Sequence, residues 1–382
     1  MHMYIQAPGR QRRIFIPGLL MVAGLLSACQ SESPLAYWIY DHLPNEASYR
    51  MRLAVIESLS EPRAGRGSLI ELRGGGLMRV SSATPSNEAQ WLEAIKFIGH
   101  KQPDIQYSLD EQGAALPWDF DSAMLLTLYH HFEQGLLFFE QLGLGLDIIR
   151  PLSVHYFPRT STGLLALPIP LVSDNAAYVI TTDSFVIMPR WLLGSVPLFA
   201  NRGVIVHELS HLVFNRLIYQ DARVPPYLLE AWPRERVNEQ RSLDEGVADA
   251  FAALQTGNPN FIAASISQEI FGIDRGLAVE RFYDEGLRTR VVGDDMTNYD
   301  PYPLGSVVAA SIWALGEEIG VAFVAQALLE SLRKLGGLGA ELSVAIFADE
   351  LVGNLAAEHR HFACQLFHQR FVAIAAELRC GL

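Results

Sequence analysis

His207, Glu208 and His211 form a His-Glu-x-x-His motif inside an apolar run over residues 203–214. On a helix, two histidines four positions apart lie on one face in successive turns, so both imidazoles can bind one metal ion. Glu208 projects about 100° around the helix from His207 and can reach a water in the open coordination position without binding the metal itself. The spacing therefore predicts a zinc site that activates water for hydrolysis.

The motif also has a structural interpretation, in which nearby carboxylates cap or pair the two histidines. The rest of the run is almost entirely apolar, which predicts a buried helix. Burying the polar triplet without partners costs free energy, whereas a metal ion makes ligands of the histidines, provided that a third ligand arrives from elsewhere. We therefore favour the metal site.

Residues 242–252 offer that third ligand. Ser242 is a typical helix N-cap and Gly257 a typical stop, so we expect a helix of about three turns in which Glu245 and Asp249 share a face. Glu245 would complete a His-His-Glu site. Asp249 would accept a hydrogen bond from the outer nitrogen of a ligating histidine and fix its orientation.

Two alternatives stay open for the third ligand. Ser242-x-x-Glu245 is also a capping box, in which Glu245 would bond back to the backbone N–H of Ser242. Glu230 and Glu239 are further candidates, in a stretch whose prolines and charges predict a loop between the two helices. Glu245 is preferred because only its segment offers Glu-x-x-x-Asp on a helix nearby.

These residues resemble the gluzincin metallopeptidases, the group that includes thermolysin and the aminopeptidase-N-type enzymes. The family pattern is His-Glu-x-x-His followed by a glutamate on the next helix, and it falls here on His207, Glu208, His211 and Glu245. The resemblance covers residues 148–316. It implies a zincin-like fold, one catalytic zinc ion, and peptide or protein substrates.

Tyr302 begins a Tyr-x-x-Gly stretch that resembles the start of a later helix in aminopeptidase-type gluzincins. There the tyrosine donates to the tetrahedral oxyanion, a role that suits a phenolic O–H because the group itself carries no charge. Tyr299 competes for this role, and a tyrosine packed at a helix start is the structural alternative.

Two family features are missing from the sequence. No Gly-x-Met-x-Asn segment precedes the zinc helix, so the resemblance does not imply aminopeptidase activity. No histidine has the context of the thermolysin-type catalytic histidine either. His359, His361 and His368 fall in a late helical segment and are expected to be ordinary surface or core residues.

The first 28 residues have the composition of a bacterial secretion signal. They carry three arginines and no acid, then an apolar run over residues 14–28 that is too short for a permanent transmembrane helix. Leu26-Ser-Ala-Cys29 resembles the lipobox, whose cysteine is lipidated and becomes the new N-terminus, although a buried or free cysteine is the alternative. Gln30 in place of Asp implies, by resemblance to the sorting rule of diderm bacteria, the outer membrane facing the periplasm.

The rest of the chain has the composition of a compact globular enzyme, with 50% hydrophobic and 19% charged residues overall. Removing residues 1–28 takes away three arginines and moves the net charge from −13 to −16. Such acidity argues against nonspecific nucleic-acid binding and against electrostatic attachment to anionic lipid. Attachment to the membrane would therefore depend on the lipid at Cys29.

Cys364 and Cys380 could form a disulfide in an oxidising compartment. Sixteen residues of continuous helix would separate them by about 24 Å, so a bond requires the helix to break before Cys380. The sequence leaves both outcomes open.

We expect an α+β fold with a zincin-like catalytic domain and a mostly α-helical C-terminal part. Its parts would be a signal peptide over 1–28, a mixed lead-in over 29–115, the catalytic core over 116–260 and a helical subdomain over 261–382. The patterns predict helices over 49–59, 88–98, 120–142, 261–270, 305–315, 321–335 and 355–378, and strands over 148–157, 178–182 and 184–188. One of these strands would edge the cleft and pair with an extended peptide.

We therefore expect a lipid-anchored zinc metallopeptidase of the bacterial envelope, in which Glu208 takes a proton from water and passes it to the leaving amine. The alternatives are a zinc-dependent binding or assembly lipoprotein with little turnover, and a non-peptidic zinc hydrolase. Retention of Glu208 favours catalysis, since a purely structural zinc needs no base.

Overall fold

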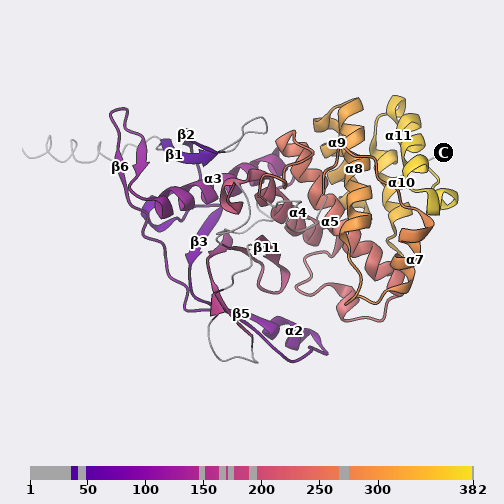
Figure 1. Ribbon diagram of the computed structural model, residues 1–382, viewed down its shortest axis with the longest axis horizontal. Helices are drawn as coiled ribbons and strands as arrows, with labels where there is room; N and C mark the ends of the chain where they lie inside the picture. The colour runs from indigo at the N-terminus through magenta and orange to yellow at the C-terminus, as the bar shows by residue number, and fades with distance from the viewer. Residues whose placement is uncertain are drawn as a thin grey trace, which may run out of the picture.

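The computed structural model describes residues 36–41, 49–145, 151–162, 169–170, 176–188, 196–265 and 275–380. Strands and one long helix make up the first half of this chain, and helices make up the second half (Figure 1). The predicted α+β class is confirmed. Cys29 and the predicted signal peptide lie outside the described residues.

The first sheet packs against helix α3 (Phe120–Gln141). Its strand order is β2-β1-β7-β6, and the strands are β1 (Ala36–Asp41), β2 (Arg50–Val55), β6 (Tyr107–Leu109) and β7 (Ala115–Pro117). Tyr37 and Ile39 of β1 are buried in the core, and Asp119 caps α3 by accepting from the Ser122 N–H at 2.7 Å. The helix predicted over 120–142 is thus confirmed.

The helix predicted over 49–59 is wrong. Residues 50–55 form β2, which pairs antiparallel with β1 from Arg50 opposite Asp41 to Val55 opposite Ala36. Charged and apolar residues alternate here over two positions as well as over a helical turn, and pairing with β1 selects the period of two.

The central sheet has the order β11-β12-β8-β3 and contacts helix α4 (Arg202–Ile218), which carries the His-Glu-x-x-His motif. Its strands are β3 (Ile70–Gly74), β8 (Leu152–Tyr156), β11 (Ala176–Val179) and β12 (Ser184–Ile187), which confirms the strands predicted in 148–157 and 184–188. The strand predicted over 178–182 ends at Val179, where the 3-10 helix η3 (Ile180–Thr182) begins. Strand β11 is the edge strand beside α4.

A third sheet lies below the central sheet in Figure 1. Its order is β10-β9-β4-β5, with β4 (Leu77–Val80), β5 (Ile95–Ile98), β9 (Arg159–Thr162) and β10 (Ile169–Pro170). Helix α2 (Glu88–Ala94) runs directly into β5. The helix predicted over 88–98 therefore ends four residues early, because residues 95–98 pair with β4 instead.

The remaining described helices pack into one body that shares the hydrophobic core with α3 (Figure 1). They are α4 (Arg202–Ile218), α5 (Arg234–Thr256), α7 (Glu285–Gly293), α8 (Tyr302–Ile319), α9 (Val321–Leu335), α10 (Val344–Asn354) and α11 (Ala357–Arg370). Short 3-10 helices are η1 (Pro62–Ala64), η4 (Leu198–Ala200), η5 (Pro226–Leu228), η6 (Gly339–Glu341) and η7 (Val372–Glu377). The helices predicted over 305–315 and 321–335 are confirmed. Residues 261–265 form turns, and the rest of the helix predicted over 261–270 lies outside the described residues.

Helix α5 is longer than the sequence pattern predicted. It begins at Arg234 after Pro233, so Ser242 lies inside the helix and the capping-box interpretation of Glu245 is wrong. The loop predicted between the two helices likewise ends earlier, and Glu239 is a helical residue. Proline at the N-cap position fixes the backbone at the helix start and gives a start signal that competes with Ser242.

Helices α5 and α8 approach each other most closely at Gly246 and Gly305. A Cβ on Gly246 would lie 2.6 Å from the carbonyl oxygen of Gly305, and a Cβ on Gly305 would lie 2.9 Å from the carbonyl oxygen of Ser242. Any side chain at either position would force the helices apart. This contact brings the first turn of α8, with Tyr302, beside Glu245.

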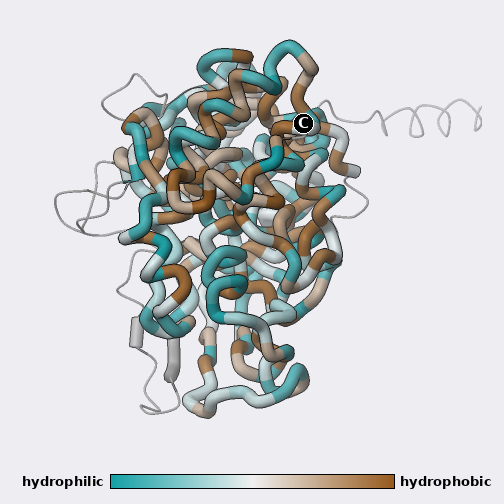
Figure 2. Tube along the Cα trace, turned by 90° about the vertical axis from the view of Figure 1, so that its right-hand side faces the viewer, coloured by the Kyte–Doolittle hydropathy of each residue, from teal (hydrophilic) through white to brown (hydrophobic). Residues whose placement is uncertain are grey.

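Hydrophobic and hydrophilic residues are interspersed along the described chain, its helices included (Figure 2). None of them combines the length and the apolar composition that a membrane crossing requires. This pattern is typical of helices that pack one face into a protein core.

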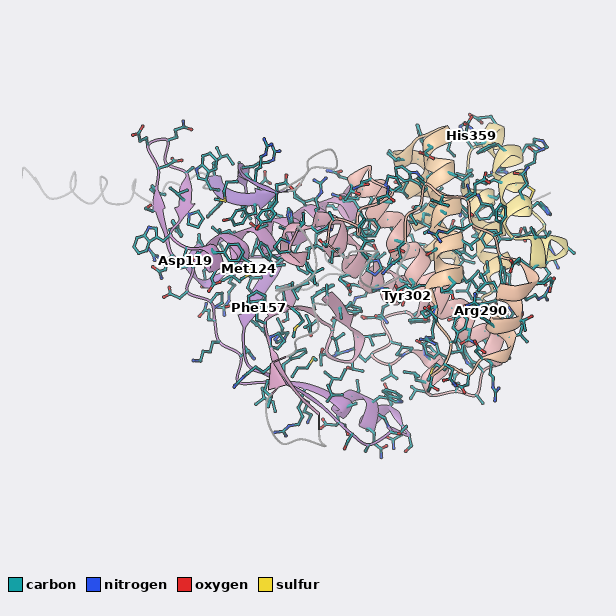
Figure 3. All side chains as sticks on the ribbon, in the orientation of Figure 1. Asp119, Met124, Phe157, Arg290, Tyr302 and His359 are labelled. Carbon is teal, nitrogen blue, oxygen red and sulfur yellow. A yellow bond between two sulfur atoms is a disulfide. The ribbon has the colours of Figure 1, made fainter. Side chains whose placement is uncertain are left out.

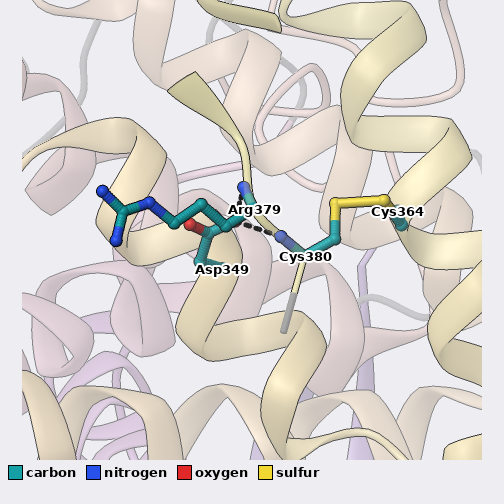
Figure 4. The surroundings of a disulfide bond; sticks show 4 residues. All are labelled: Asp349, Cys364, Arg379 and Cys380. Atoms are coloured by element: carbon teal, nitrogen blue, oxygen red, sulfur yellow. Dashed lines mark hydrogen bonds between the residues drawn. A yellow bond between two sulfur atoms is a disulfide. The ribbon is translucent and has the colours of Figure 1, made fainter. Parts of the chain in front are cut away.

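Cys364 and Cys380 form a disulfide with a Cα–Cα distance of 5.5 Å (Figure 4). The helix predicted over 355–378 breaks at Arg370, which lets the chain turn back so that Cys380 reaches Cys364. Asp349 holds the returning segment by accepting hydrogen bonds from the backbone N–H groups of Arg379 and Cys380 at 2.8 and 2.7 Å (Figure 4).

Replacing Cys364 and Cys380 together with alanine should lower the free energy of unfolding by about 3 kcal/mol, because the bond closes a loop of this length in the unfolded chain. Chemical denaturation of the oxidised wild type and of the double variant measures the difference. Dithiothreitol should lower the free energy of unfolding of the wild type and leave that of the double variant unchanged. A wild type that does not respond to dithiothreitol would contradict the prediction.

Candidate metal centre

Helix α4 carries the His-Glu-x-x-His motif into the core. Its N-cap Asn201 accepts from the backbone N–H of Gly203 at 3.0 Å and donates to the carbonyl of Phe261 at 2.8 Å, so the helix start is fixed to a distant segment. His207 and Glu208 are each only 6% exposed. The motif is therefore buried, as the apolar run around it predicts.

Three potential ligand atoms converge from α4 and α5. The Nε2 atoms of His207 and His211 are 3.1 Å apart, and Glu245 Oε2 lies 3.6 Å from the first and 3.9 Å from the second. The structure thus brings together the three residues that the sequence assigns as zinc ligands. Glu208 and Tyr302 line the same cavity.

Two aspartates of α5 fix the orientation of the histidines. Asp249 Oδ1 lies 3.0 Å from Nδ1 of His207, the position expected from the sequence, and Asp244 Oδ1 lies 2.8 Å from Nδ1 of His211. These contacts favour a proton on Nδ1 of each ring. Both Nε2 lone pairs then point at the common centre, as in metal sites whose histidines are held by carboxylates.

The donor set fits a zinc ion. Ligands bound tetrahedrally at about 2.0–2.1 Å lie roughly 3.3–3.4 Å from one another, close to the three separations observed. Glu245 Oε2 is buried and has no hydrogen-bond partner among the described residues. Two lone pairs and a carboxylate oxygen that face one another in a buried site repel each other unless a cation lies between them.

The electrostatics of the site also demand positive charge. Burial alone would lower the pKa of His211, but Asp244, Glu245 and Glu208 outweigh it and raise the pKa to about 10. Without a metal, a proton on His211 supplies the cation that these carboxylates favour. A divalent ion would replace that proton, because a ligating histidine must be neutral at Nε2.

The sequence did not predict the presence of Arg275 at this site. Its Nε donates to Asp249 Oδ2 at 3.0 Å, and its Nη2 also bonds Asp249. Burial opposes ionisation of Asp249, but Arg275 and His207 outweigh it and lower the pKa to about 2. Arg275 comes from a segment without periodicity, so only tertiary packing could reveal it. Asp244 was also missed, although it is adjacent to Glu245 in the sequence.

Tyr302 and Tyr299 differ in their position relative to the cavity. Tyr302 begins α8, lines the cavity and packs its ring 4.5 Å from the guanidinium carbon of Arg275. Tyr299 is only 4% exposed, and its hydroxyl bonds Ser242 Oγ at 2.8 Å, away from the cavity. Figure 3 shows Tyr302 between the strand-rich half and the C-terminal helices. The geometry therefore favours Tyr302 as the oxyanion donor.

Glu208 is held against the edge strand. Its Oε2 accepts from the backbone N–H of Tyr178 in β11 at 2.8 Å, and burial raises its pKa. The surrounding cavity has a volume of about 380 Å³. It is lined by residues of β11, α4, α5 and α8, together with Phe261, Ile262 and Arg275.

The other residues considered from the sequence lie away from this cavity. Glu230 is exposed and accepts from Trp232 Nε1 at 2.9 Å, while buried Glu239 pairs with Arg236, so neither is a ligand. The three late histidines lie on α11, and Figure 3 shows His359 at the outer end of the C-terminal helices. None of these histidines is among the described residues that line the cavity.

No model of a known protein family matches the chain, and no curated protein matches it. The chemistry of the site therefore rests on the geometry of its own residues.

Replacing Glu245 with glutamine should lower zinc affinity by more than the about 10- to 100-fold that loss of an orienting hydrogen-bond partner costs, because a ligand itself is removed. Asp244→Asn should fall within that 10- to 100-fold range. Competition with a chromogenic chelator measures both affinities.

Glu239→Gln is the matched control for Glu245→Gln, since both carboxylates are buried on α5. It should leave zinc affinity unchanged. Equal zinc affinity in Glu245→Gln and Glu239→Gln would remove Glu245 from the metal site.

Proposed function

We propose that this protein is a zinc metallopeptidase of the gluzincin type. The observation that carries the proposal is the convergence of His207, His211 and Glu245 beside a buried glutamate that is not itself a ligand. A structural zinc site uses four protein ligands, whereas a catalytic site keeps an open position. Three converging ligand atoms at the wall of a cavity fit the catalytic kind.

The proposed chemistry divides between the ion and the chain. A zinc ion held there would polarise the scissile carbonyl and acidify a water molecule. Glu208 accepts the proton of that water and returns it to the leaving amine. Its raised pKa suits both steps, and the bond from the Tyr178 N–H fixes the direction in which its carboxylate points.

Tyr302 is proposed to donate its phenolic O–H to the oxyanion that develops on the substrate. Its pKa is raised by the charge of Glu245 and by burial, so the hydroxyl keeps its proton at neutral pH. Arg275, which packs against the ring of Tyr302, fixes the position of that ring.

A peptide substrate is supported by the position of β11. In the described part of the central sheet this strand pairs only with β12, and its residues Ala176, Ala177 and Tyr178 line the cavity. An extended peptide can add to such an edge through main-chain hydrogen bonds, which places its carbonyl groups along the cavity.

The proposed location is the bacterial cell envelope, through a lipid at Cys29. It rests on the resemblance of Leu26-Ser-Ala-Cys29 to a lipobox and on the acid-free segment before it. The disulfide between Cys364 and Cys380 agrees with an oxidising compartment such as the periplasm.

Glu208→Gln should retain zinc and thermal stability but lose peptidase activity by about 10²- to 10⁴-fold, because the change is nearly isosteric and removes only the base. Digestion of an unbiased peptide library, read by mass spectrometry, measures the activity of both proteins. A variant that cleaves like the wild type would exclude Glu208 as the base. A wild type that is fully loaded with zinc and cleaves nothing would favour the zinc-dependent binding or assembly factor instead.

Tyr302→Phe should lower kcat by about 10²- to 10³-fold with little change in KM, because the lost O–H acts only in the transition state. Tyr299→Phe is the matched control: it loses the bond to Ser242 and should cost stability without changing kcat. If Tyr299→Phe lowers kcat and Tyr302→Phe does not, the two assignments are reversed.

A further inference from the structure

A second cavity lies between the central sheet and the segment formed by α2 and β5. It has a volume of about 380 Å³ and shares no lining residue with the metal-site cavity. Figure 1 shows α2 and β5 below β3 and β11. Leu152 and Val154 of β8 face the core, so alternation along the strand turns Ser153 and His155 toward this second cavity.

Positive charge gathers in the second cavity although the whole chain carries a net charge of −13. Arg73, Lys96 and Arg223 line it together with His100 and His155, and the described lining includes no aspartate or glutamate. Burial, followed by the charges of Arg73 and His100, lowers the pKa of His155 to about 4. Burial is the largest of these causes, and the two positive groups add to it, while Glu71 acts in the opposite direction.

The neighbouring acids lie outside the lining of the cavity. Glu71 accepts from Arg73 Nη2 at 2.8 Å, and Glu93 pairs with Lys96, but neither glutamate is among the lining residues. Arg223 has no carboxylate partner in this region and instead donates to the carbonyl of Thr181 at 2.6 Å.

Three buried polar atoms of the lining residues lack a hydrogen-bond partner among the described residues. They are Arg73 Nε, Thr181 Oγ1 and His155 Nδ1. Thr181 is 8% exposed and His155 is 3% exposed, so bulk water does not satisfy them. Unpaired buried polar atoms are rare in folded proteins, and three on one cavity indicate a missing polar partner.

The walls of the second cavity are held in place without that partner. Phe97 stacks on His155 with ring centroids 3.8 Å apart, and the hydroxyls of Thr182 and Ser184 bond each other at 2.7 Å. Arg223 fastens the η3 turn through its bond to the Thr181 carbonyl. The donors are thus already positioned before any ligand enters.

We propose that the second cavity binds a phosphate-type oxyanion, either free or as the monoester group of a larger ligand. Residues that carry guanidinium, ammonium and hydroxyl donors line it, on β3, β5, η3 and the segment after α4. A tetrahedral dianion has three or more acceptor oxygens that can take up donors from several directions, whereas a carboxylate has two. Arginine matches phosphate with parallel hydrogen bonds, and lysine adds a point charge.

Isothermal titration calorimetry of the zinc-loaded full-length protein with inorganic phosphate, in sodium chloride, tests this site. Wild type should bind one phosphate saturably. Thr181→Val, which removes only the unpaired hydroxyl, and Lys96→Met should each weaken binding by about tenfold. Thr181→Val should remain as stable as wild type, since no protein bond is lost. Lys334→Met is the matched control for Lys96→Met, because Lys334 is also an exposed lysine paired with a glutamate, and it should leave binding unchanged.

Glycerol 3-phosphate distinguishes the two sources of the group. Binding at least as tight as inorganic phosphate indicates a site for a phosphorylated ligand, and weaker binding indicates a site for the free ion. Absence of saturable binding would overturn the proposal. So would binding that neither Thr181→Val nor Lys96→Met weakens, as expected for phosphate on the zinc ion, or acetate binding as tight as phosphate.

Discussion

The site depends on one electrostatic constraint: two imidazole lone pairs and a carboxylate oxygen face one another in a buried space. Asp244 and Asp249 hold the Nδ1 protons of the two rings, so the Nε2 lone pairs cannot turn away. A cation at the centre offsets this repulsion. The pKa of His211 is raised for the same reason, because the neighbouring carboxylates favour a positive charge on the ring. Zinc satisfies the spacing, the donor types and the charge together.

The helices pack around this centre. Helix α5 supplies one ligand and both orienting aspartates, so its position against α4 sets most of the site. The contact of Gly246 with Gly305 lets α8 approach closely enough to place Tyr302 in the same cavity. Arg275 then links Asp249 to the ring of Tyr302. The proposed metal ligands and the proposed oxyanion donor are thereby joined through a single packed unit.

The sequence predicted the parts of the site whose geometry is local. His207 and His211 lie on one face of one helix, and Glu245 and Asp249 lie on one face of another, so the spacing alone predicts that the members of each pair lie side by side. The predicted start of α5 was wrong because Ser242 and Pro233 are both start signals. In the folded chain the helix begins after the earlier one, Pro233. The helix predicted over residues 49–59 was wrong because the short pattern of residues 50–55 fits both the period of a helix and the period of a strand. Arg275 and the second cavity could not be predicted, since segments far apart in the chain meet only after folding.

The most direct test of the central claim is the anomalous scattering of crystals of the protein at the zinc absorption edge. One strong peak is expected within about 2.0–2.1 Å of His207 Nε2 and His211 Nε2 and about 2.0–2.2 Å of a Glu245 carboxylate oxygen. Crystals grown with zinc that show no peak among these three atoms, or a peak only elsewhere, would contradict the claim that they form a metal centre.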